Sequence, residues 1–261
     1  LGIFAETFNE HEGAYYQLTA DIDYNDAWNP IGNGATELED EKATFKGTFD
    51  GNGHKITNLK FTKTNDEGLV GFFGFAYGSY IHDLEVSVTI DLSVSKLLEE
   101  AYIGGIVGYA ENTQVDNCKV NVLKCKVASA QVAASTVMMG GVAGYIAYYD
   151  PNNQAIMTSF NTNNSVSGNL RLTAPNFPVA SVGGVIGFVN TGFGSGSSSI
   201  TNNLFSGVIE GGTYVGGIVG TSSYYVGLAN NIAISASLTT YGNGYSYAGG
   251  LGGHSGVDIN K

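Results

Sequence analysis

A short glycine-bracketed motif recurs along the chain and constrains its fold more than any other feature of the sequence. Each copy holds a glycine, a large apolar residue, a variable residue and a second glycine, and the first glycines of successive copies are 34, 36, 43, 33 and 33 residues apart. The six copies begin at Gly71, Gly105, Gly141, Gly184, Gly217 and Gly250. Self-similarity at this period indicates a repeat protein, in which each unit is stabilised mainly by packing against its neighbours.

Asparagine or aspartate recurs between the motif copies and predicts the corners of each repeat. It follows an apolar residue and one spacer, as in Val115-Asp116-Asn117. The members of this set are Asn58, Asp83, Asn117, Asn202 and Asn230, with Asn163 as a looser member. Asparagine tolerates left-handed backbone at a corner, and its amide can hydrogen-bond to an identical amide in the next unit. We therefore expect these side chains to stack in a column.

The segments between the glycines and the corners have the composition of strands rather than helices. Runs such as Lys119–Leu123, Ser206–Ile209 and Ile232–Ser235 alternate or cluster apolar residues. Ankyrin and tetratricopeptide repeats have a similar period, but they need helical spacing and strong helix formers, whereas these units carry several glycines. The predicted fold is all-β: a single-stranded right-handed parallel β-helix, or β-solenoid, with three short strands and three corners in each turn.

The first 60 residues differ from the rest and are expected to form an atypical N-terminal capping unit. Residues 1–50 hold 11 of the 23 acidic residues of the chain. A solenoid must protect its open end from pairing with other strands, so a terminal unit with its own character is expected. The predicted organisation is one continuous domain, in which residues 1–60 form the cap and the first β-helix turn and residues 61–261 form the repeats.

Three segments near the N-terminus complete the pattern: Tyr15–Asp23, Trp28–Gly32 and Phe45–Ile56. Together with the glycine motifs, they resemble bacterial surface proteins with GLUG-motif repeats, and the resemblance extends from about Gly13 onward. The first repeat departs from the pattern by lacking a doubled glycine, and the last by having Gly252 within the motif. The resemblance implies an exported, surface-displayed β-helix of the kind found in adhesins and in non-catalytic regions of larger surface proteins. It transfers no catalytic residue.

The charge balance limits the partners of the chain. Its 23 acidic and 11 basic residues give a net charge of −12, so neither nucleic acid nor a bare anionic membrane is an expected partner. The uncharged segment 127–149 is long enough to cross a bilayer, but polar residues interrupt it and it contains one copy of the motif, so no membrane span is expected. The expected partner is a host or environmental glycan or a surface protein, and the expected state is a monomer or a part of a longer chain.

The cysteines and the N-terminus say little about the compartment. Cys118 and Cys125 are seven residues apart, which places them on opposite faces of a straight strand and makes a bridge between them unexpected. No basic-then-apolar segment precedes Leu1, which fits a cytosolic protein or an exported chain whose leader has been removed. The family resemblance favours export, to the cell surface or the extracellular space.

Many β-helices are polysaccharide lyases or glycoside hydrolases, but few residues here suit those reactions. A lyase of the pectate type uses a basic residue beside calcium-holding carboxylates, yet Arg171 is the only arginine and lies among few acids. Hydrolysis needs two facing carboxylates, for which Asp83, Glu85 and Asp116 are the candidates, one turn apart. We therefore predict no catalytic residue and keep a polysaccharide-degrading enzyme as an alternative.

One segment begins like a calcium loop. Asp21, Asp23 and Asn25 alternate as the first ligands of such a loop do, but the glycine at its sixth position and the glutamate at its twelfth are missing, so weak Ca²⁺ binding is the one cofactor considered. No other metal site is predicted. The histidines share no metal-ligand spacing, and each is interpreted as a surface or turn residue: His11, His54, His82 and His254.

The most informative functional pattern is aromatic. Phe75, Tyr109, Tyr145 and Phe188 stand directly after the motif in four of the six repeats. They share parity with the variable second motif residue, so the large first motif residue should point into the core and the aromatic side chains should point outward. Such side chains could stack sugar rings or contact a partner protein; alternatively a loop covers them, or the glycine bulge turns them inward. Further candidate contact residues in loops are Tyr148, Tyr149, Tyr224 and Tyr225.

These observations favour a non-enzymatic cell-surface or secreted module for adhesion or for glycan or protein binding, with the aromatic side chains as its contact residues. There are two alternatives: a structural spacer of a larger surface protein, and a β-helix polysaccharide lyase or glycoside hydrolase. A groove lined by Tyr109, Tyr145 and Phe188 would favour binding, whereas paired carboxylates about 5–10 Å apart in a cleft would favour hydrolysis.

Overall fold

Parallel β-strands dominate the structure. The computed structural model describes residues 1, 4, 8, 13–32, 44–62, 68–94, 100–129, 136–148, 159–173, 179–191, 198–241 and 246–259. Their strands form three sheets of 12, 8 and 6 strands, in which neighbouring strands pair in parallel.

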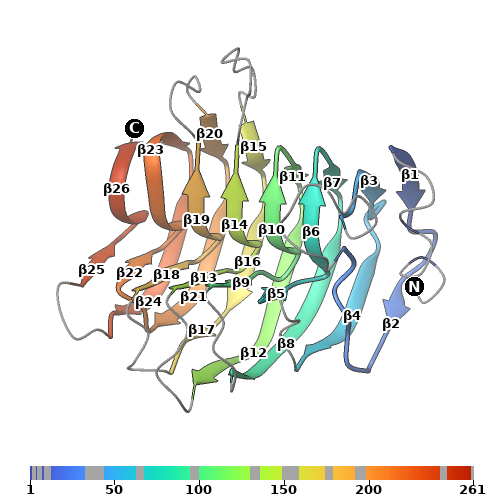
Figure 1. The fold of residues 1–261 in the computed structure, drawn as a ribbon, viewed down its shortest axis with the longest axis horizontal. Coiled ribbons are helices and arrows are strands. Elements are labelled where there is room, and N and C mark those ends of the chain that lie inside the picture. The colour runs from blue at the N-terminus through green and yellow to red at the C-terminus, as the bar shows by residue number, and fades with distance from the viewer. Residues whose placement is uncertain are drawn as a thin grey trace.

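The strands of each sheet lie side by side along the long axis of the molecule (Figure 1). The first sheet contains β1 (Ala14–Gln17), β3 (Gly47–Asp50), β7 (Tyr80–His82), β11 (Gln114–Asp116), β15 (Ser159–Thr162), β20 (Ser198–Thr201), β23 (Val219–Ala229), β19 (Ile186–Asn190), β14 (Ala143–Ala147), β10 (Val107–Glu111), β6 (Phe73–Tyr77) and β26 (Gly252–Ile259). The second contains β2 (Ile22–Asp23), β4 (Lys55–Phe61), β8 (Glu85–Val94), β12 (Lys119–Ser129), β16 (Ser165–Gly168), β17 (Leu170–Arg171), β21 (Leu204–Glu210) and β24 (Ile232–Thr239). The third contains β5 (Leu69–Val70), β9 (Glu100–Ile103), β13 (Thr136–Gly140), β18 (Val179–Gly183), β22 (Tyr214–Gly216) and β25 (Tyr247–Gly249).

The chain visits all three sheets in each repeat. From β9 in the third sheet it continues into β10 and β11 in the first and then into β12 in the second. The next repeat places β13, β14, β15 and β16 beside these four strands, in parallel. Figure 1 shows the repeats following one another from the N-terminal to the C-terminal end. The predicted all-β architecture with parallel strands is confirmed, and the arrangement fits a β-helix.

This repeat has four strands rather than the three predicted. The stretch after the motif is divided between β10 and β11 at Asn112, whose backbone is left-handed with φ of 48°. Gly78, with φ of 58°, divides β6 from β7 in the same way. In the later repeat the strand β23 is undivided, and it pairs with both β19 and β20. The first sheet therefore has two arms that meet at β23.

Both apolar residues of the motif are buried in one core. The first residues are buried as predicted in five copies: Phe72, Ile106, Val142, Val185 and Ile218. The second residues are buried in the same core, which contradicts the outward direction expected from their parity: Phe73, Val107, Ala143, Ile186 and Val219. The chain bends at Gly105 and Ile106, directly before β10 begins. Side chains alternate regularly only along a straight strand, and here Ile106, Val107 and Ala110 face the main core while Tyr109 packs in a second cluster, so the alternation is broken next to the bend.

The predicted corner column is present. Its members have left-handed backbone, with φ between 50° and 58°: Asp83, Asn117, Asn163, Asn202 and Asn230. The Asn202 amide donates to Asn163 Oδ1 at 3.2 Å, and the Asn117 amide donates to Asp83 Oδ1, so side-chain stacking is confirmed for these two pairs. Asn58 also has a positive φ, of 60°, but it lies inside β4 at an irregularity of the register and is not part of the column.

A second set of asparagines stacks inside the protein, directly after the corner column. Asn203 Oδ1 accepts the backbone N–H of Asn164 at 3.0 Å, and Asn231 Oδ1 accepts the backbone N–H of Asn203 at 2.9 Å. Asn164 and Asn203 are buried. These side chains replace strand-to-strand hydrogen bonds where the chain turns away from its neighbour.

The described part of residues 1–60 joins the same sheets as the repeats. Strand β1 pairs with β3, and β2 pairs with β4. The Trp28 ring stacks on Phe72 of the first motif copy, with centroids 5.0 Å apart, and the Trp28 indole N–H donates to the Phe72 carbonyl at 2.9 Å. The N-terminal segment is thus anchored to the core of the first repeat.

Two further sequence predictions can be compared with the fold. Cys118 and Cys125 are free, and both are buried in the main core, so the opposite faces expected from their spacing along a straight strand are not observed. Among the described residues, no helix is long and apolar enough to cross a membrane. The described parts of the uncharged segment 127–149 include strands β13 and β14.

Candidate functional site

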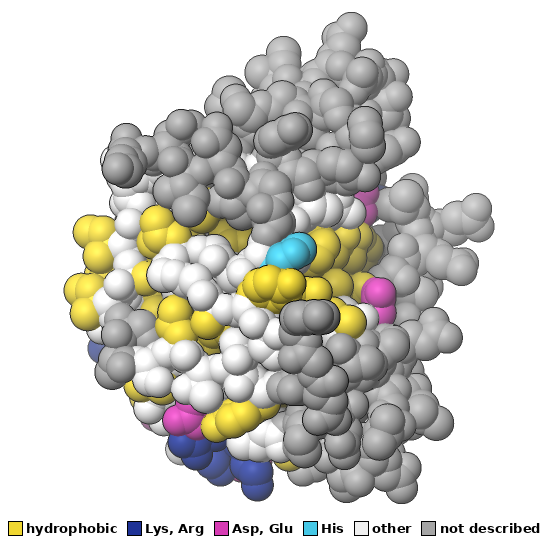
Figure 2. All heavy atoms as spheres, turned by 90° about the vertical axis from the view of Figure 1, so that its left-hand side faces the viewer, with side chains coloured by type: hydrophobic (Ala, Val, Ile, Leu, Met, Phe, Trp, Pro, Cys, Tyr) yellow, Lys and Arg dark blue, Asp and Glu magenta, His cyan; other side chains and the backbone are white. Residues whose placement is uncertain are grey.

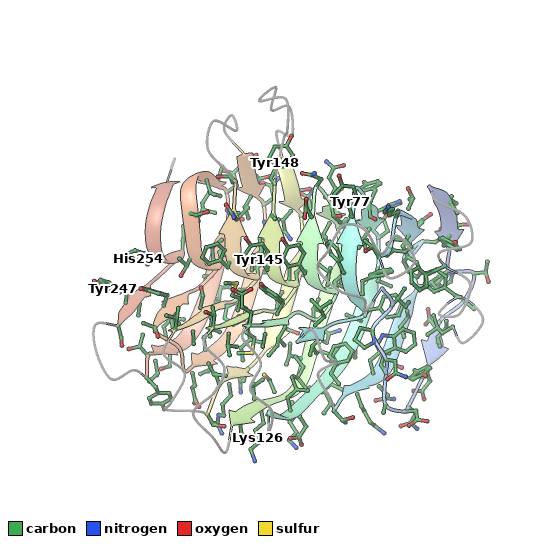
Figure 3. The ribbon with its side chains drawn as sticks, viewed as in Figure 1. Tyr77, Lys126, Tyr145, Tyr148, Tyr247 and His254 are labelled. Carbon is green, nitrogen blue, oxygen red and sulfur yellow. The ribbon has the colours of Figure 1, made fainter. Side chains whose placement is uncertain are left out.

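The four aromatic residues that follow the motif form one row on the first sheet. Phe75, Tyr109, Tyr145 and Phe188 lie in register on β6, β10, β14 and β19. We call these four residues the aromatic row; Tyr145 is labelled in Figure 3. The row does not join the main core but belongs to a second cluster, which it shares with side chains of the third sheet: Leu69, Tyr102 and Met138.

The rings of the row stack on one another. The Tyr109 and Tyr145 centroids are 4.7 Å apart with 17° between the ring planes, and the Tyr145 and Phe188 centroids are 5.3 Å apart with 2° between them. Phe75 instead meets Tyr109 edge-on, at 5.0 Å and 87°. Stacked neighbours cover each other's ring faces, so a ligand would meet mainly ring edges and phenol groups at Tyr109 and Tyr145.

Exposure divides the row into a buried end and a half-buried remainder. Phe75 is only 1% exposed, so this predicted contact residue has almost no surface to offer a ligand. Tyr109, Tyr145 and Phe188 are half-buried and pack against the second cluster. The structure directs the row away from the main core but into a second, partly buried cluster rather than to the open surface, and it leaves three rather than four side chains partly exposed.

Acidic side chains border the row. Burial raises the pKa of the Tyr109 phenol well above its ordinary value, and the neighbouring Tyr145, Glu111 and Glu100 reinforce the shift. Burial also raises the pKa of Tyr145 and that of the Glu111 carboxyl. The Tyr102 hydroxyl donates to the Glu100 carboxylate. The tyrosines of the row are therefore neutral hydrogen-bonding groups at physiological pH, beside a negative edge.

The phenol of Tyr145 has a defined partner. Asn190 Nδ2 donates to the Tyr145 hydroxyl at 2.9 Å, and Ser223 Oγ donates to Asn190 Oδ1 at 2.8 Å. This chain of hydrogen bonds links three consecutive repeats and fixes the orientation of the phenol.

The stacked row ends at the fifth repeat. There Thr221 occupies the position in register with Phe188, is 8% exposed, and hydrogen-bonds to Ser181 Oγ at 2.8 Å. Beyond it a second aromatic group begins, in which the His254 ring lies 4.9 Å from Tyr214 and 5.0 Å from Tyr247. Viewed from the C-terminal end, the surface shows hydrophobic side chains around a histidine (Figure 2).

The third-sheet position that faces the aromatic row was not predicted from the sequence. Tyr102, Met138, Ser181 and Tyr214 stand in register, each three residues before the first glycine of its motif copy. Aligning the repeats on that glycine would have found the position. The position holds tyrosine, methionine and serine in different repeats, so no single residue type recurs there to mark it.

The predicted loop aromatics are only partly described. Tyr148 follows β14, and its backbone N–H donates to the Asn190 carbonyl at 2.7 Å; Figure 3 shows its side chain. Tyr149 lies outside the described residues, and so do the side chains of Tyr224 and Tyr225.

The segment predicted as a weak calcium site has protein partners of its own. Asp21 Oδ1 lies 3.1 Å from the His54 ring nitrogen, whereas Asp23 Oδ1 accepts from the Asn58 amide at 2.7 Å. The Asn25 carbonyl accepts from Lys60 Nζ at 3.1 Å. The three residues thus bond to different donors, and Ca²⁺ binding there stays a prediction.

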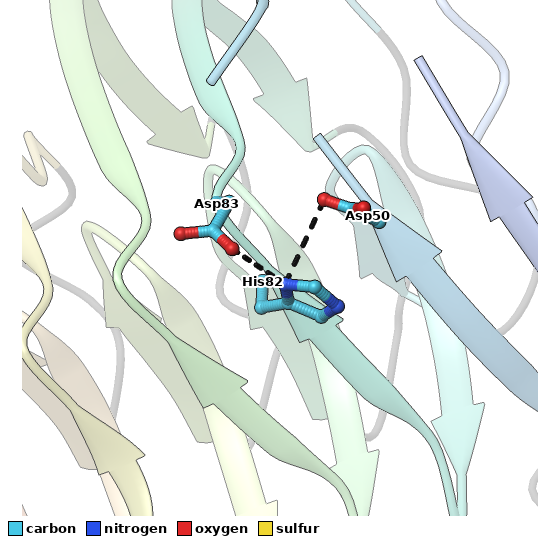
Figure 4. A group of neighbouring side chains, drawn as sticks. All are labelled: Asp50, His82 and Asp83. Atoms are coloured by element: carbon cyan, nitrogen blue, oxygen red, sulfur yellow. Dashed lines mark hydrogen bonds and ion pairs between the residues drawn. The ribbon is translucent and has the colours of Figure 1, made fainter. Parts of the chain in front are cut away.

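A second group of polar side chains lies at the end of β3 and β7, where no metal site was predicted. Asp50, His82 and Asp83 each offer a ligand atom, and these atoms lie within 4.8 Å of one another (Figure 4). His82 Nδ1 is 2.7 Å from Asp83 Oδ2 and 3.7 Å from Asp50 Oδ1. The His82 side chain is 16% exposed, in contrast to the surface or turn histidine expected from the sequence. Asp50 and His82 are in register on adjacent strands, which sequence spacing alone does not show.

Hydrogen bonds keep both carboxylates of this group ionised. Burial opposes the charge of Asp50, but hydrogen bonds from Tyr15, Gln17 and a backbone N–H outweigh it, so the pKa of Asp50 lies below its ordinary value. Hydrogen bonds from His82 and Asn117 lower the pKa of Asp83.

The other residues weighed for catalysis are also bonded to neighbours. Asp116 accepts from Asn163 Nδ2 at 2.9 Å, and Glu85 accepts from Asn121 Nδ2 at 3.1 Å. Arg171 Nε lies 2.6 Å from Glu210 Oε2 on the adjacent strand. These contacts give Asp116, Glu85 and Arg171 structural partners.

Comparison with known proteins bears on one repeat directly. Residues 100–124 match the model of the GLUG motif. The match spans β9, β10 and β11 and the start of β12, with the glycines at 104–105 and the corner Asn117, so the resemblance stated from the sequence is confirmed there. Among curated proteins, none is significantly similar to this chain.

One solved structure aligns with most of the chain. It is the crystal structure of a putative immunoglobulin A1 protease from Bacteroides ovatus, with 17% sequence identity, a TM-score of 0.49, and coverage of 94% of this chain and 81% of that one. A likeness at this level indicates no function for the present chain.

Proposed function

We propose that the chain is a non-enzymatic module of a cell-surface or secreted protein, and that it binds a glycan or a partner protein through Tyr109, Tyr145 and Phe188. The observation that carries the proposal is the half-buried stack of these three rings across three successive repeats. The fold proposed with it is a right-handed parallel β-helix forming one domain, with residues 1–60 as cap and first turn and residues 61–261 as repeats.

The arrangement suits binding because it is rigid before any ligand arrives. Neighbouring strands in a sheet lie about 4.8 Å apart, which fixes the spacing of the rings. The stacked rings present their edges and the two phenol groups in fixed positions, and pre-ordered groups lower the cost of association. The negative edge at Glu100 and Glu111 favours a neutral or basic ligand over an acidic one.

The proposal of export and surface display is supported by the GLUG match at residues 100–124 and by the resemblance of the longer sequence. The proposal places binding in the aromatic row rather than in any catalytic group, because each carboxylate weighed for catalysis has protein partners.

The test is a glycan array probed with wild type and Tyr145→Ala, combined with an assay for released sugar. We expect wild type to retain a glycan without cleaving it and Tyr145→Ala to bind at least tenfold more weakly, while circular dichroism shows both to be folded. Leu123→Ala is the matched control, because Leu123 is 60% exposed on β12, a strand of the second sheet, and should leave binding unchanged.

Each contrary outcome has a distinct meaning. Equal binding by Tyr145→Ala would remove the row as the site. Cleavage of the glycan would show an enzyme. No retention on the array, together with no binding to candidate surface proteins, would favour the structural spacer.

A further inference from the structure

The group at the end of β3 and β7 carries a second function independent of the aromatic row. We propose that Asp50, His82 and Asp83 form a binding site for a divalent transition-metal ion of the Zn²⁺ type, with His82 Nδ1 and one oxygen of each carboxylate as ligands. These are the three residues that, within the described part of the chain, bring their ligand atoms within 4.8 Å of one another.

The fold aims the three side chains at one point. Asp50 and His82 end adjacent strands in register, and Asp83 follows at the corner, where its left-handed backbone (φ of 54°) turns the carboxylate back toward the imidazole. Figure 4 shows His82 Nδ1 facing both carboxylates. It is 2.7 Å from Asp83 Oδ2 and 3.7 Å from Asp50 Oδ1.

Neighbouring residues orient both carboxylates so that one oxygen of each faces His82. Asp50 Oδ2 accepts from the Tyr15 hydroxyl and from Gln17 Nε2, the latter at 2.7 Å, while Oδ1 accepts the Asn52 N–H at 2.6 Å and faces His82. On Asp83, the Asn117 amide holds Oδ1, so Oδ2 is the oxygen that faces His82. Hydrogen bonds of this kind fix ligands in metal sites and contribute strongly to affinity.

The charge of the group favours a cation. Two carboxylates face one imidazole, and a third aspartate, Asp116, stands in register with His82 on the next strand. In the part of the chain that the structure describes, no lysine or arginine pairs with Asp50 or Asp83; the ion pairs found for them involve His82. The Asp50 side chain is only 10% exposed, and a buried carboxylate gains most from a bound cation.

The corner column shows that Asp83 is not needed for the turn. In later repeats the same position holds Asn117, Asn163, Asn202 or Asn230, each with left-handed backbone. In this column the aspartate, Asp83, directly follows His82 in the same repeat, where its charge serves the group rather than the corner.

The donor set selects the class of metal. One imidazole nitrogen with two carboxylate oxygens suits Zn²⁺ and its first-row neighbours, whereas Ca²⁺ takes oxygen ligands only. The group supplies three protein ligands and leaves a further position for water.

The test is isothermal titration of the EDTA-treated full chain with ZnCl₂, repeated with CaCl₂. We expect saturable binding of Zn²⁺ at one site, no comparable Ca²⁺ binding, and at least tenfold weaker Zn²⁺ binding in Asp83→Asn and His82→Gln. Asp83→Asn places at the corner the residue that four other repeats use, so it should keep the fold. The matched control is His54→Gln, because His54 lies beside a single carboxylate, that of Asp21, and should leave the affinity unchanged.

The proposal would be overturned by no saturable Zn²⁺ binding in wild type, by unchanged affinity in Asp83→Asn, or by tighter binding of Ca²⁺ than of Zn²⁺. If His82→Gln fails to fold, as judged by circular dichroism, Asp83→Asn alone decides. A loss of affinity in His54→Gln equal to that in Asp83→Asn would also refute it, because Zn²⁺ would then bind elsewhere.

Discussion

Replacing the first glycine of a central motif copy by alanine should strongly destabilise the protein, and the size of the effect follows from the spacing of the repeats. A Cβ atom on Gly184 would lie 2.1 Å from the Gly217 carbonyl oxygen and 2.4 Å from Phe205 Cγ. Gly184 does not have a left-handed backbone, so the effect of Gly184→Ala would come from this contact and not from a forbidden conformation.

The magnitude can be worked from that contact. The carbonyl would have to retreat by about 1.3 Å to reach an ordinary contact distance of 3.4 Å. A shift of this size breaks the hydrogen bonds that link Gly184 to the next and the preceding repeat, which measure 3.0 and 3.3 Å. Two lost hydrogen bonds cost about 2 kcal/mol, and overpacking costs about 1–3 kcal/mol more, so we expect a loss of about 4 kcal/mol in the free energy of unfolding.

The same motif position in the last repeat provides the control. A Cβ atom on Gly250 would meet nothing within 4 Å, so Gly250→Ala should change stability by less than about 1 kcal/mol. Gly249→Ala tests whether a small effect at Gly250 comes from the open space there or from its place in the last repeat. A Cβ atom on Gly249 would lie 1.9 Å from the Gly252 carbonyl oxygen, so Gly249→Ala should destabilise the last repeat.

Urea unfolding followed by far-UV circular dichroism measures all three variants. The reasoning is refuted if Gly184→Ala is within 1 kcal/mol of wild type, or if Gly250→Ala loses as much stability as Gly184→Ala.

Asn161→Val should raise the free energy of unfolding by about 1 kcal/mol in the same assay, because the Asn161 amide nitrogen is buried without a partner and its register neighbours are apolar; a loss of stability would contradict this. Glu111→Gln should stabilise the protein at neutral pH but not below the ordinary glutamate pKa. Burial raises the folded-state pKa of Glu111, so stability is lost as pH rises through it, and a pH-independent effect in urea unfolding would contradict the argument. Burial raises the pKa of Cys118 to about 12 and that of Cys125 to about 11, so neither thiol should react with a disulfide reagent until urea unfolds the chain; rapid reaction in the folded protein would refute their burial.

The parallel sheets could be predicted because equivalent residues of successive repeats become neighbours on adjacent strands. Tyr109 and Tyr145 hold the same place in successive motif units, and the structure puts them in register. The burial of both Ile106 and Val107 could not be predicted in this way, because it depends on a bend whose position is set by the packing of neighbouring repeats. The break at Asn112 did carry a sequence signal that was missed, because Asn112 and Gly78, at equivalent places in successive repeats, are of the residue types that best tolerate left-handed backbone.

The two candidate sites were unequally visible. The aromatic row could be predicted because an aromatic residue recurs directly after the motif. That the rings stack and cover one another's faces could be seen only in the structure. The group of Asp50, His82 and Asp83 contains no local metal motif. It forms only because the register places Asp50 beside His82.

Departures from a column are the most informative positions in a protein of this kind. In a stack of repeats, each column repeats the residue that suits its local backbone and packing, and that residue needs no functional explanation. Asn117 and Asn202 fit this rule at the corner, whereas Asp83 keeps the backbone of the column and adds a charge beside an imidazole. Thr221 departs from the aromatic column by replacing a ring with a small polar side chain. It ends the stacked row, and its buried hydroxyl is hydrogen-bonded to the Ser181 hydroxyl. If columns supply the scaffold, function should be sought where one repeat breaks its column without breaking its fold, and Asp83 meets that condition.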